Sequence, residues 1–420
     1  MKGLRKYLTP FAPDQSGAVA MCYALGGMVV IVDAGGCAGN ICGFDEPRWQ
    51  PDYLPGFCRD GDNEETTPRV QAVFSAGLRD MDAILGRDDL LIRKLEDASK
   101  KIDAKFIALI GTPVPAVIGT DLAADALMAE KKTHIPCIAV STDGMHLYDR
   151  GIEETLLVLM KTFAQEKPLR HVQTASHNPV LPESSEGKQG QAQEKTQHDT
   201  AVKRRRICGV LGLNPLDLFD PAWTEAIRTS LLERGYDEVL LYGMEGGLDA
   251  LKRSALAERN YVVSTAGIAA AKYLKERFGT PFEVSFPADP MILLEDDPAD
   301  CIRSLGSDAQ ILVVHQQVLA NAIRDSLKEA KVPGTVTVAT WFDLKDELAM
   351  DGDVRLKEED DFTALVRERH WDLIIADPTL RQMTDGTQGR WIDAFHFAVS
   401  GQAAIDTSRR KRGIKTGCLS

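Results

Sequence analysis

The chain has 420 residues, of which 44% are hydrophobic and 26% charged, so it can bury the cores of two or three domains. These proportions exclude a wholly disordered chain, and no run approaches the about 18 apolar residues of a membrane span. The 49 basic and 62 acidic residues give a net charge of −13, which argues against nucleic acid as the main partner. The basic start of the chain lacks the apolar core of a signal peptide, so we expect a cytoplasmic protein.

Apolar runs of strand length alternate with amphipathic segments along most of the chain. This alternation is typical of βαβ units with a parallel, doubly wound sheet. In the first part we expect a helix over 16–25, strands over 28–32, 105–112 and 135–141, and helices over 121–132 and 151–164. Residues 167–206 have almost no large apolar side chain after Leu181, which predicts a flexible linker.

The alternation resumes after the linker. Strands are expected over 207–214, 238–242 and 260–264, with helices over 221–235, 247–258 and 267–279. A last unit has predicted strands from 309, over 335–341 and over 372–376, and helices over 318–331 and 360–370. We therefore predict three Rossmann-like α/β domains, residues 1–166, 207–308 and 309–407, with a cleft between them and a loose basic tail over 408–420.

Four of the eight cysteines occur early in the chain, and clustered cysteines in a reducing compartment are often metal ligands. The apolar run 28–32 leads into Gly35 and Gly36, which permit a sharp turn at the carboxyl end of a strand, where ligands collect in parallel sheets. Iron–sulfur clusters are held by cysteine thiolates, and the candidate ligands are Cys37, Cys42, Cys58 and Cys22. The alternative is that these cysteines are small buried apolar residues, above all Cys22 inside its helix.

Several nucleotide and hydrolase motifs are missing. The chain has no G-x-x-x-x-G-K-[ST], so we expect no ATP site of the P-loop kind on it. It also has no G-x-G-x-x-G, no C-x-x-C and no G-x-S-x-G, which disfavours a nicotinamide site, a zinc finger and a serine hydrolase.

The segment 10–40 (PFAPDQSGAVAMCYALGGMVVIVDAGGCAGN) resembles the N-terminal segment of nitrogenase component 1 proteins. In that family a helix with a Gly-Ala start leads to a strand and to a turn whose cysteine ligates an iron–sulfur cluster at a subunit interface. The resemblance implies that Cys37, in the turn 33–37 (DAGGC), is the cluster ligand. Segments 74–95, 105–126 and 372–402 are also similar to parts of the family, so the resemblance spans nearly the whole chain as three α/β domains.

The chain departs from the family at several ligand positions. The family's first cluster cysteine falls near Pro13 or Asp14, and its third at Thr112. The cysteine and histidine that hold the molybdenum–iron cofactor fall near Ser264 and one residue before His396. We therefore do not expect that cofactor or dinitrogen reduction, and Asp14 is a candidate replacement ligand.

The resemblance implies a reductase related to the cofactor-free members. Such a subunit passes electrons from an ATP-dependent iron protein through a [4Fe–4S] cluster to a tetrapyrrole-type or other small organic substrate. The cluster would be shared across the two-fold interface of a homodimer or with a paralogous subunit, and ATP would belong to the iron protein.

Two histidines are candidates for proton donation in the cleft between the domains. His315 ends a predicted strand and His396 lies in the apolar stretch WIDAFHF. Each is alternatively a hydrogen-bonded structural residue. For the whole chain, two other functions stay open: a scaffold of the same fold that assembles a metal cluster, and a metal-free ligand-binding protein.

Overall fold

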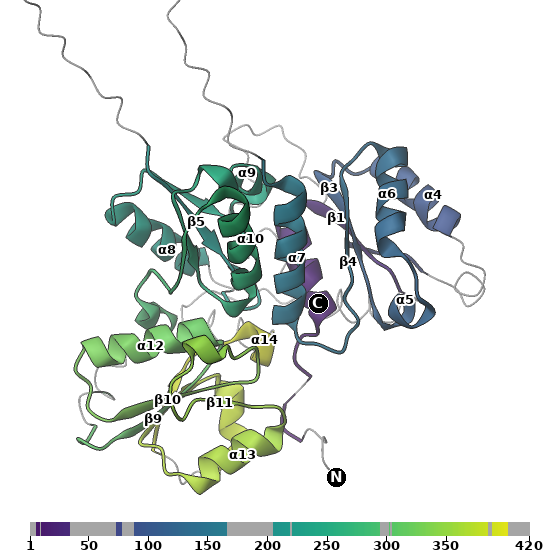
Figure 1. Ribbon diagram of the computed structural model, residues 1–420. Coiled ribbons are helices and arrows are strands. Elements are labelled where there is room, and N and C mark those ends of the chain that lie inside the picture. The colour runs from purple at the N-terminus through teal and green to yellow at the C-terminus, as the bar shows by residue number, and fades with distance from the viewer. Residues whose placement is uncertain are drawn as a thin grey trace, which may run out of the picture.

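In the computed structural model, three α/β units are each built around one all-parallel sheet (Figure 1). The structure describes residues 6–8, 10–33, 73–77, 88–165, 205–218, 221–294, 302, 305–384 and 389–401. The predicted fold class, parallel sheets flanked by helices, is confirmed. The predicted linker and basic tail fall almost wholly outside the described residues.

The first unit has the strand order β2-β1-β3-β4. Its strands are β1 (Gly27–Ile31), β2 (Val73–Ser75), β3 (Phe106–Ile110) and β4 (Cys137–Val140). Its helices are α1 (Asp14–Ala24), α4 (Asp88–Ser99), α5 (Pro113–Ile118), α6 (Leu122–Thr133) and α7 (Tyr148–Phe163). The apolar runs of β1 and β3 are buried along their whole length, because α1 and α7 cover one face of the sheet and α4 and α6 the other.

The second unit has the order β6-β5-β7-β8. Its strands are β5 (Ile207–Leu211), β6 (Glu238–Leu241), β7 (Arg259–Val262) and β8 (Phe282–Val284). Its helices are α8 (Pro221–Glu233), α9 (Gly247–Lys252) and α10 (Ile268–Phe278), with the 3-10 turns η2 (Ser254–Leu256), η3 (Thr265–Gly267) and η4 (Pro290–Leu293). The helix expected over 247–258 is therefore shorter than predicted, because the backbone N–H of Glu258 already bonds to β5 through the carbonyl of Ile207.

The third unit has the order β11-β10-β9-β12-β13. Its strands are β9 (Gln310–Val314), β10 (Thr335–Thr340), β11 (Val354–Arg355), β12 (Leu373–Ala376) and β13 (Arg390–Asp393). Its helices are α12 (Gln317–Glu329), α13 (Glu359–Glu368) and α14 (Phe397–Ser400), with the 3-10 turns η5 (Asp346–Leu348) and η6 (Pro378–Met383). The strand order reverses between β9 and β12, which is the point where parallel sheets commonly bind ligands.

Helix α7 joins the first unit to the second. It packs against α1 on one side and against α10 and η3 on the other, and Figure 1 shows it between the two sheets. One continuous apolar core includes side chains of all three units, among them Ile152, Leu211 and Trp341. Near the N-terminus, the ring of Phe11 meets that of Trp341 edge-on at 5.4 Å, which ties the first unit to the third. The three units are therefore packed against one another.

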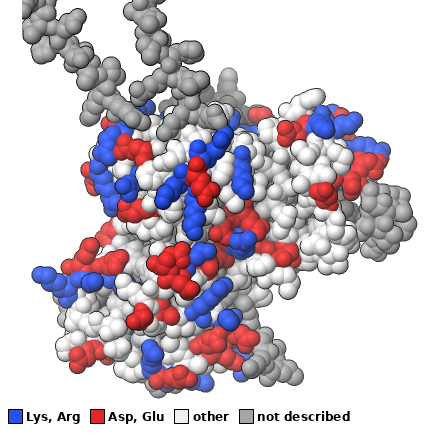
Figure 2. Space-filling view, in the orientation of Figure 1, with Lys and Arg blue, Asp and Glu red and all other residues white. Residues whose placement is uncertain are grey.

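Charge is interspersed over the molecule. On the face shown in Figure 2, acidic and basic side chains alternate across all three units instead of separating into patches of one sign. Within the described part of the chain, no helix combines the length and apolar character needed to cross a membrane.

Candidate active site at the junction of three units

Three of the eight predicted site residues lie in the described part of the chain, namely Cys22, His315 and His396. The other five lie outside the described residues: Gly35, Gly36, Cys37, Cys42 and Cys58. The structure brings the two histidines together, and it places Cys22 elsewhere.

Cys22 is fully buried in the apolar core between α1, α7 and β1. Burial raises the pKa of its thiol, which disfavours the thiolate that a metal requires. The position of Cys22 is therefore that of a packing residue.

At the carboxyl end of the first sheet, where the turn with the predicted cluster ligand Cys37 begins, the described side chains present oxygen atoms. Asp33 accepts a hydrogen bond from the Ser75 hydroxyl at 2.6 Å, and the Thr112 hydroxyl donates to the Val32 carbonyl at 2.8 Å. Asp14 accepts backbone N–H bonds, one of them from Gly144 at 2.9 Å. The described residues at this edge offer no thiolate, so an iron–sulfur cluster here would depend on cysteines outside them.

His315 and His396 stack face to face, with ring centroids 4.1 Å apart and an angle of 13° between the rings. Both nitrogens of His315 meet backbone groups: Nδ1 accepts from the N–H of Gln316 at 2.9 Å, and Nε2 lies 3.4 Å from the carbonyl of Phe395. Burial lowers the pKa of His315 to about 3, and the charge of His396 adds to this effect. His315 is therefore a neutral ring with a fixed tautomer at physiological pH.

His396 belongs to a buried hydrogen-bonded triangle. Its Nε2 lies 3.0 Å from Oδ1 of Asp217 and 3.0 Å from the hydroxyl of Tyr148, and that hydroxyl donates to the same Asp217 oxygen. The other oxygen of Asp217 accepts from Nδ2 of Asn214 at 2.7 Å. Tyr148, Asp217 and His396 are each almost completely buried, so the three polar groups satisfy one another away from water.

The triangle contains a charge. Burial alone would raise the pKa of Asp217, but hydrogen bonds from His396, Tyr148 and Asn214 and the charge of His396 hold it below its usual value. Burial, together with the negative charge of Asp217, raises the pKa of Tyr148 well above its usual value. At neutral pH the triangle therefore holds an Asp217 carboxylate and a neutral Tyr148.

Each corner of the triangle comes from a different unit. Tyr148 opens α7 after β4, Asp217 follows β5, and His396 follows β13. All three positions lie past the carboxyl ends of parallel strands, so the three sheets direct these ends toward one junction. Tyr148, Asp217 and Asn214 were not among the residues predicted from sequence. The one signal for them was the presence of polar side chains in the segments that follow apolar strands.

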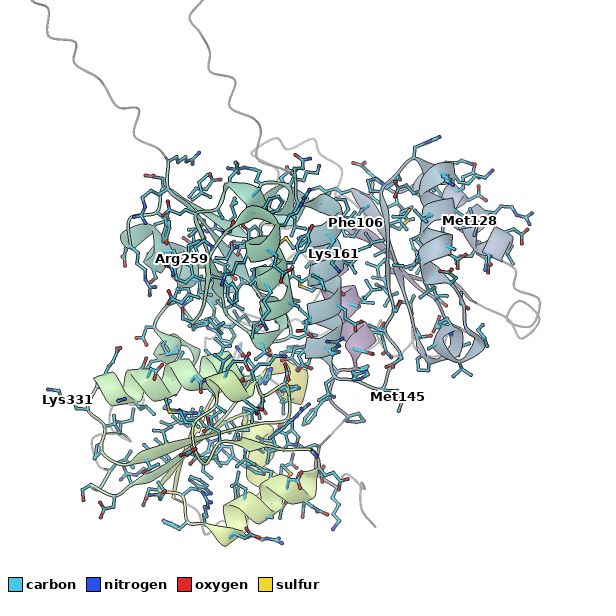
Figure 3. The ribbon with its side chains drawn as sticks, in the orientation of Figure 1. Phe106, Met128, Met145, Lys161, Arg259 and Lys331 are labelled. Carbon is cyan, nitrogen blue, oxygen red and sulfur yellow. The ribbon has the colours of Figure 1, made fainter. Side chains whose placement is uncertain are left out.

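A cavity of about 270 Å³ opens beside the triangle and is lined by residues of all three units. Leu147 and Asp149, which flank Tyr148, lie on its wall, and Met145 on its rim is labelled in Figure 3. The ring of Phe342 forms part of the wall and lies 4.9 Å from the rings of both Tyr148 and His396. The charged residues of the lining are Asp149, Arg150, Glu153, Asp343, Lys345 and Arg355.

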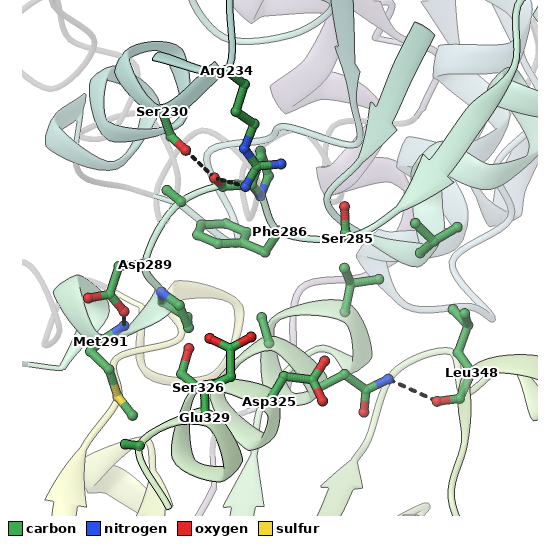
Figure 4. Close-up of a pocket in the computed structure, with 18 residues that line it drawn as sticks. Ser230, Arg234, Ser285, Phe286, Asp289, Met291, Asp325, Ser326, Glu329 and Leu348 are labelled. Atoms are coloured by element: carbon green, nitrogen blue, oxygen red, sulfur yellow. Dashed lines mark hydrogen bonds between the residues drawn. The ribbon is translucent and has the colours of Figure 1, made fainter. Parts of the chain in front are cut away.

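A larger cavity of about 690 Å³ lies between the second and third units (Figure 4). There Ser230 and Arg234 both donate to the carbonyl of Pro287, and the side chains of Asp325 and Glu329 on α12 line the opposite side. None of the three predicted site residues that the structure describes lines this cavity. The smaller cavity is the better active-site candidate, because it adjoins the buried titratable triangle.

Comparison with known proteins agrees with this architecture. Two solved structures described as nitrogenase Cp1, at pH 6.5 and at pH 5, match with a TM-score of 0.60 each, at 12% and 14% identity. Each match covers 99% of this chain, and they cover 94% and 90% of those chains. At this identity the likeness shows the fold alone. No curated protein matches the chain in sequence.

The family model of nitrogenase component 1 type oxidoreductases matches residues 54–291, which is more than half of the chain. The family predicted from the resemblance of segment 10–40 is therefore confirmed. This chain belongs to the nitrogenase component 1 type oxidoreductase family, whose members generally bind iron–sulfur clusters.

Proposed function

We propose that the chain is a reductase subunit that reduces a small organic substrate in the cavity between its three units, with electrons from an ATP-dependent iron protein. The observation that carries the proposal is the cavity itself, which adjoins the buried triangle of Tyr148, Asp217 and His396 across the ring of Phe342. Reduction of an organic molecule consumes protons as well as electrons, and a buried histidine beside the cavity is suited to supply them.

The electron relay is a [4Fe–4S] cluster held mainly by Cys37, with further ligands from Cys42, Cys58 or Cys22, and shared across a two-fold interface of a homodimer or with a paralogous subunit. When bound, the cluster supplies only electron transfer. Of these cysteines Cys22 is the least suited, since its thiol is buried in the core between helices.

The size of the cavity favours a small substrate over a tetrapyrrole. Pockets for drug-sized ligands have volumes of about 300–1,000 Å³. The 270 Å³ between the described residues lies just below that range.

Of the two stacked histidines, His396 is the better proton donor. Both nitrogens of His315 are held by backbone groups, whereas only Nε2 of His396 has hydrogen-bond partners among the described residues. His315 then serves as a neutral ring that supports His396 from one face.

The test is the iron and acid-labile sulfide content per chain after anaerobic purification. We expect about two irons per chain, which corresponds to one four-iron cluster per dimer. Cys37→Ala should lose this iron, and the control Cys137→Ala, in a half-buried position on β4, should keep it. Reduction of substrate should require reductant, ATP and the iron protein.

Other outcomes would replace the proposal. Iron that transfers readily from this chain to other proteins, without substrate turnover, would indicate an assembly scaffold. A wild-type protein that is free of iron after strictly anaerobic purification would leave a metal-free ligand-binding protein.

A further inference from the structure

We propose that Asp217 is a positioning residue that holds His396 with a hydrogen on Nε2, so that Nδ1 delivers the proton to a substrate in the cavity. The inference deepens the proposed function and rests on it for the substrate. Its physical core, the tautomer of one ring, is a property of this chain alone.

The first step concerns the fixed nitrogen. Nε2 of His396 lies 3.0 Å from Oδ1 of Asp217, and a carboxylate oxygen can only accept at this position. The hydroxyl of Tyr148 also directs its hydrogen to this oxygen, so it is not the donor to Nε2. Nε2 must therefore carry a hydrogen.

The second step concerns the free nitrogen. Nδ1 of His396 has no hydrogen-bond partner among the described residues. The residue lines a small cavity of about 10 Å³ together with Asp377, Trp341 and Phe342, which is about the space that one water molecule needs. Trp341 and Phe342 also line the 270 Å³ cavity, so the two spaces share a wall.

The proton step follows from these positions. The substrate atom that has accepted electrons from the iron protein takes a proton from a water in the 10 Å³ cavity, and that water takes a proton from Nδ1 of His396. The ring becomes neutral and keeps the hydrogen on Nε2, which stays hydrogen-bonded to Asp217. Nδ1 then regains a proton from solvent through the cavity. Asp217 stays a carboxylate throughout, and its role is to orient the ring.

The remaining titratable groups around His396 do not compete for this role. His315 stacks on the ring but has both nitrogens on backbone groups. Asp377 accepts the backbone N–H of His396 at 3.0 Å, and Asp149 accepts the backbone N–H of Asp343 at 2.7 Å. Among the described residues, Asp217 is the acid that contacts the imidazole nitrogens.

Asn214 makes the inference testable, because it distinguishes a carboxylate from an amide at position 217. Its Oδ1 accepts from the backbone N–H groups of Leu216 and Asp217, at 3.0 and 2.9 Å, so its amide orientation is fixed. Its Nδ2 then donates toward residue 217 at 2.7 Å. In Asp217→Asn the amide oxygen must face Asn214, because Nδ2 of Asn214 donates there. The NH₂ group then faces His396, and Nε2 of His396 must accept a hydrogen bond from it.

The experiment is nitrogen NMR of histidine-labelled full-length protein at pH 8, with His396→Gln to assign the signal. We expect the Nε2–H form in wild type and the Nδ1–H form in Asp217→Asn. Tyr148→Phe should keep the Nε2–H form, as should the control Asp149→Asn, which changes a neighbouring buried carboxylate that does not contact the ring. The double variant Asn214→Asp/Asp217→Asn should restore the Nε2–H form, because the new amide can then donate to residue 214.

Substrate reduction supplies a second measurement. Asp217→Asn should lower kcat by about 10²–10⁴-fold, with a smaller effect on KM. An Asp217→Asn protein that retains the Nε2–H form would overturn the inference, and so would a wild type in the Nδ1–H form. The NMR readout needs neither substrate nor iron. A failure there therefore leaves the reductase proposal standing, and an iron-free protein with the expected tautomers would refute only the reductase proposal.

Discussion

The crossing of α1 and α7 offers a stringent test of the structure, because two glycines let the helix backbones approach closely. A Cβ on Gly151 would lie 2.6 Å from the carbonyl carbon of Asp14 and closer still to its oxygen. Ordinary contact begins at 3.4 Å, so the shortfall is about 0.8 Å or more against rigid backbone. Gly17 meets the carbonyl of Tyr148 in the same way from the opposite helix.

Gly151→Ala should therefore destabilise the protein although alanine favours a helix. The gain in helix propensity is about 1 kcal/mol, whereas forcing two packed helices apart costs about 3 kcal/mol or more. We expect a net loss of about 2–3 kcal/mol in the free energy of unfolding and a fall in Tm of roughly 4–12 °C, measured by circular dichroism. The control is Gly306→Ala, since a Cβ there meets no atom within 4 Å. A Gly151→Ala protein at least as stable as wild type would refute the close approach of the helices.

Three further predictions concern buried groups. The pKa of His315 is lowered to about 3 in the folded state from 6.5, so its stabilising effect is complete above pH 6.5 and is lost as the pH falls toward 3. Between pH 7 and 5, wild type should therefore lose about 2 kcal/mol more of its free energy of unfolding than His315→Gln, and equal losses would contradict this. Asp353→Asn should cost about 3 kcal/mol, because it leaves the buried guanidinium of Arg324 without its 2.7 Å ion pair, and adding Arg324→Met should recover part of that loss in a urea titration. Cys22→Ala should keep the full iron content and unfold at a slightly lower temperature, and Cys22→Ser should be less stable still, since it buries a hydroxyl in the apolar core. Loss of iron in both variants would make Cys22 a ligand.

The fold was largely predictable because its central strands and helix ends depend on local chemistry. The apolar centre of the run 105–112 forms β3 (Phe106–Ile110), which is buried along its whole length, as continuous apolar residues in a parallel sheet should be. Asp121 caps α6 by accepting from the N–H of Ala124 at 3.0 Å, and Gly279 ends α10 with a φ of 71°. These features follow from residues near one another in the chain.

Four of the six described edge strands were not predicted, because they are short and only partly apolar. β2, β8, β11 and β13 each have two to four residues and lie at the margins of their sheets. β13 begins with the exposed Arg390 and ends with Asp393, which is the charged pattern of an edge strand and resembles a loop in sequence. Pairing with β12 in the folded third unit makes it a strand.

The candidate site was predicted only in part, because its residues are far apart in the chain. His315 and His396 were expected at the cleft because each follows or lies within an apolar stretch, and the structure stacks them. The partners of His396 are 179 and 248 residues away in the chain, in other units. No spacing in one segment carries that information, since it arises only when the carboxyl ends of three sheets meet.

The origin of the triangle in three units has a physical consequence for the candidate active site. Tyr148, Asp217 and His396 hydrogen-bond only while all three units are docked, so the triangle depends on the packing around α7. The carbonyl of Tyr148 lies directly against Gly17 of α1. The helix crossing that stabilises the first unit therefore also fixes the position of Tyr148 relative to His396. Gly17→Ala should therefore change the NMR signals of the His396 ring without touching it, whereas the exposed change Gly306→Ala should leave them in place. The glycines of α1 and α7 would then determine both the packing of the first unit and the position of the His396 ring.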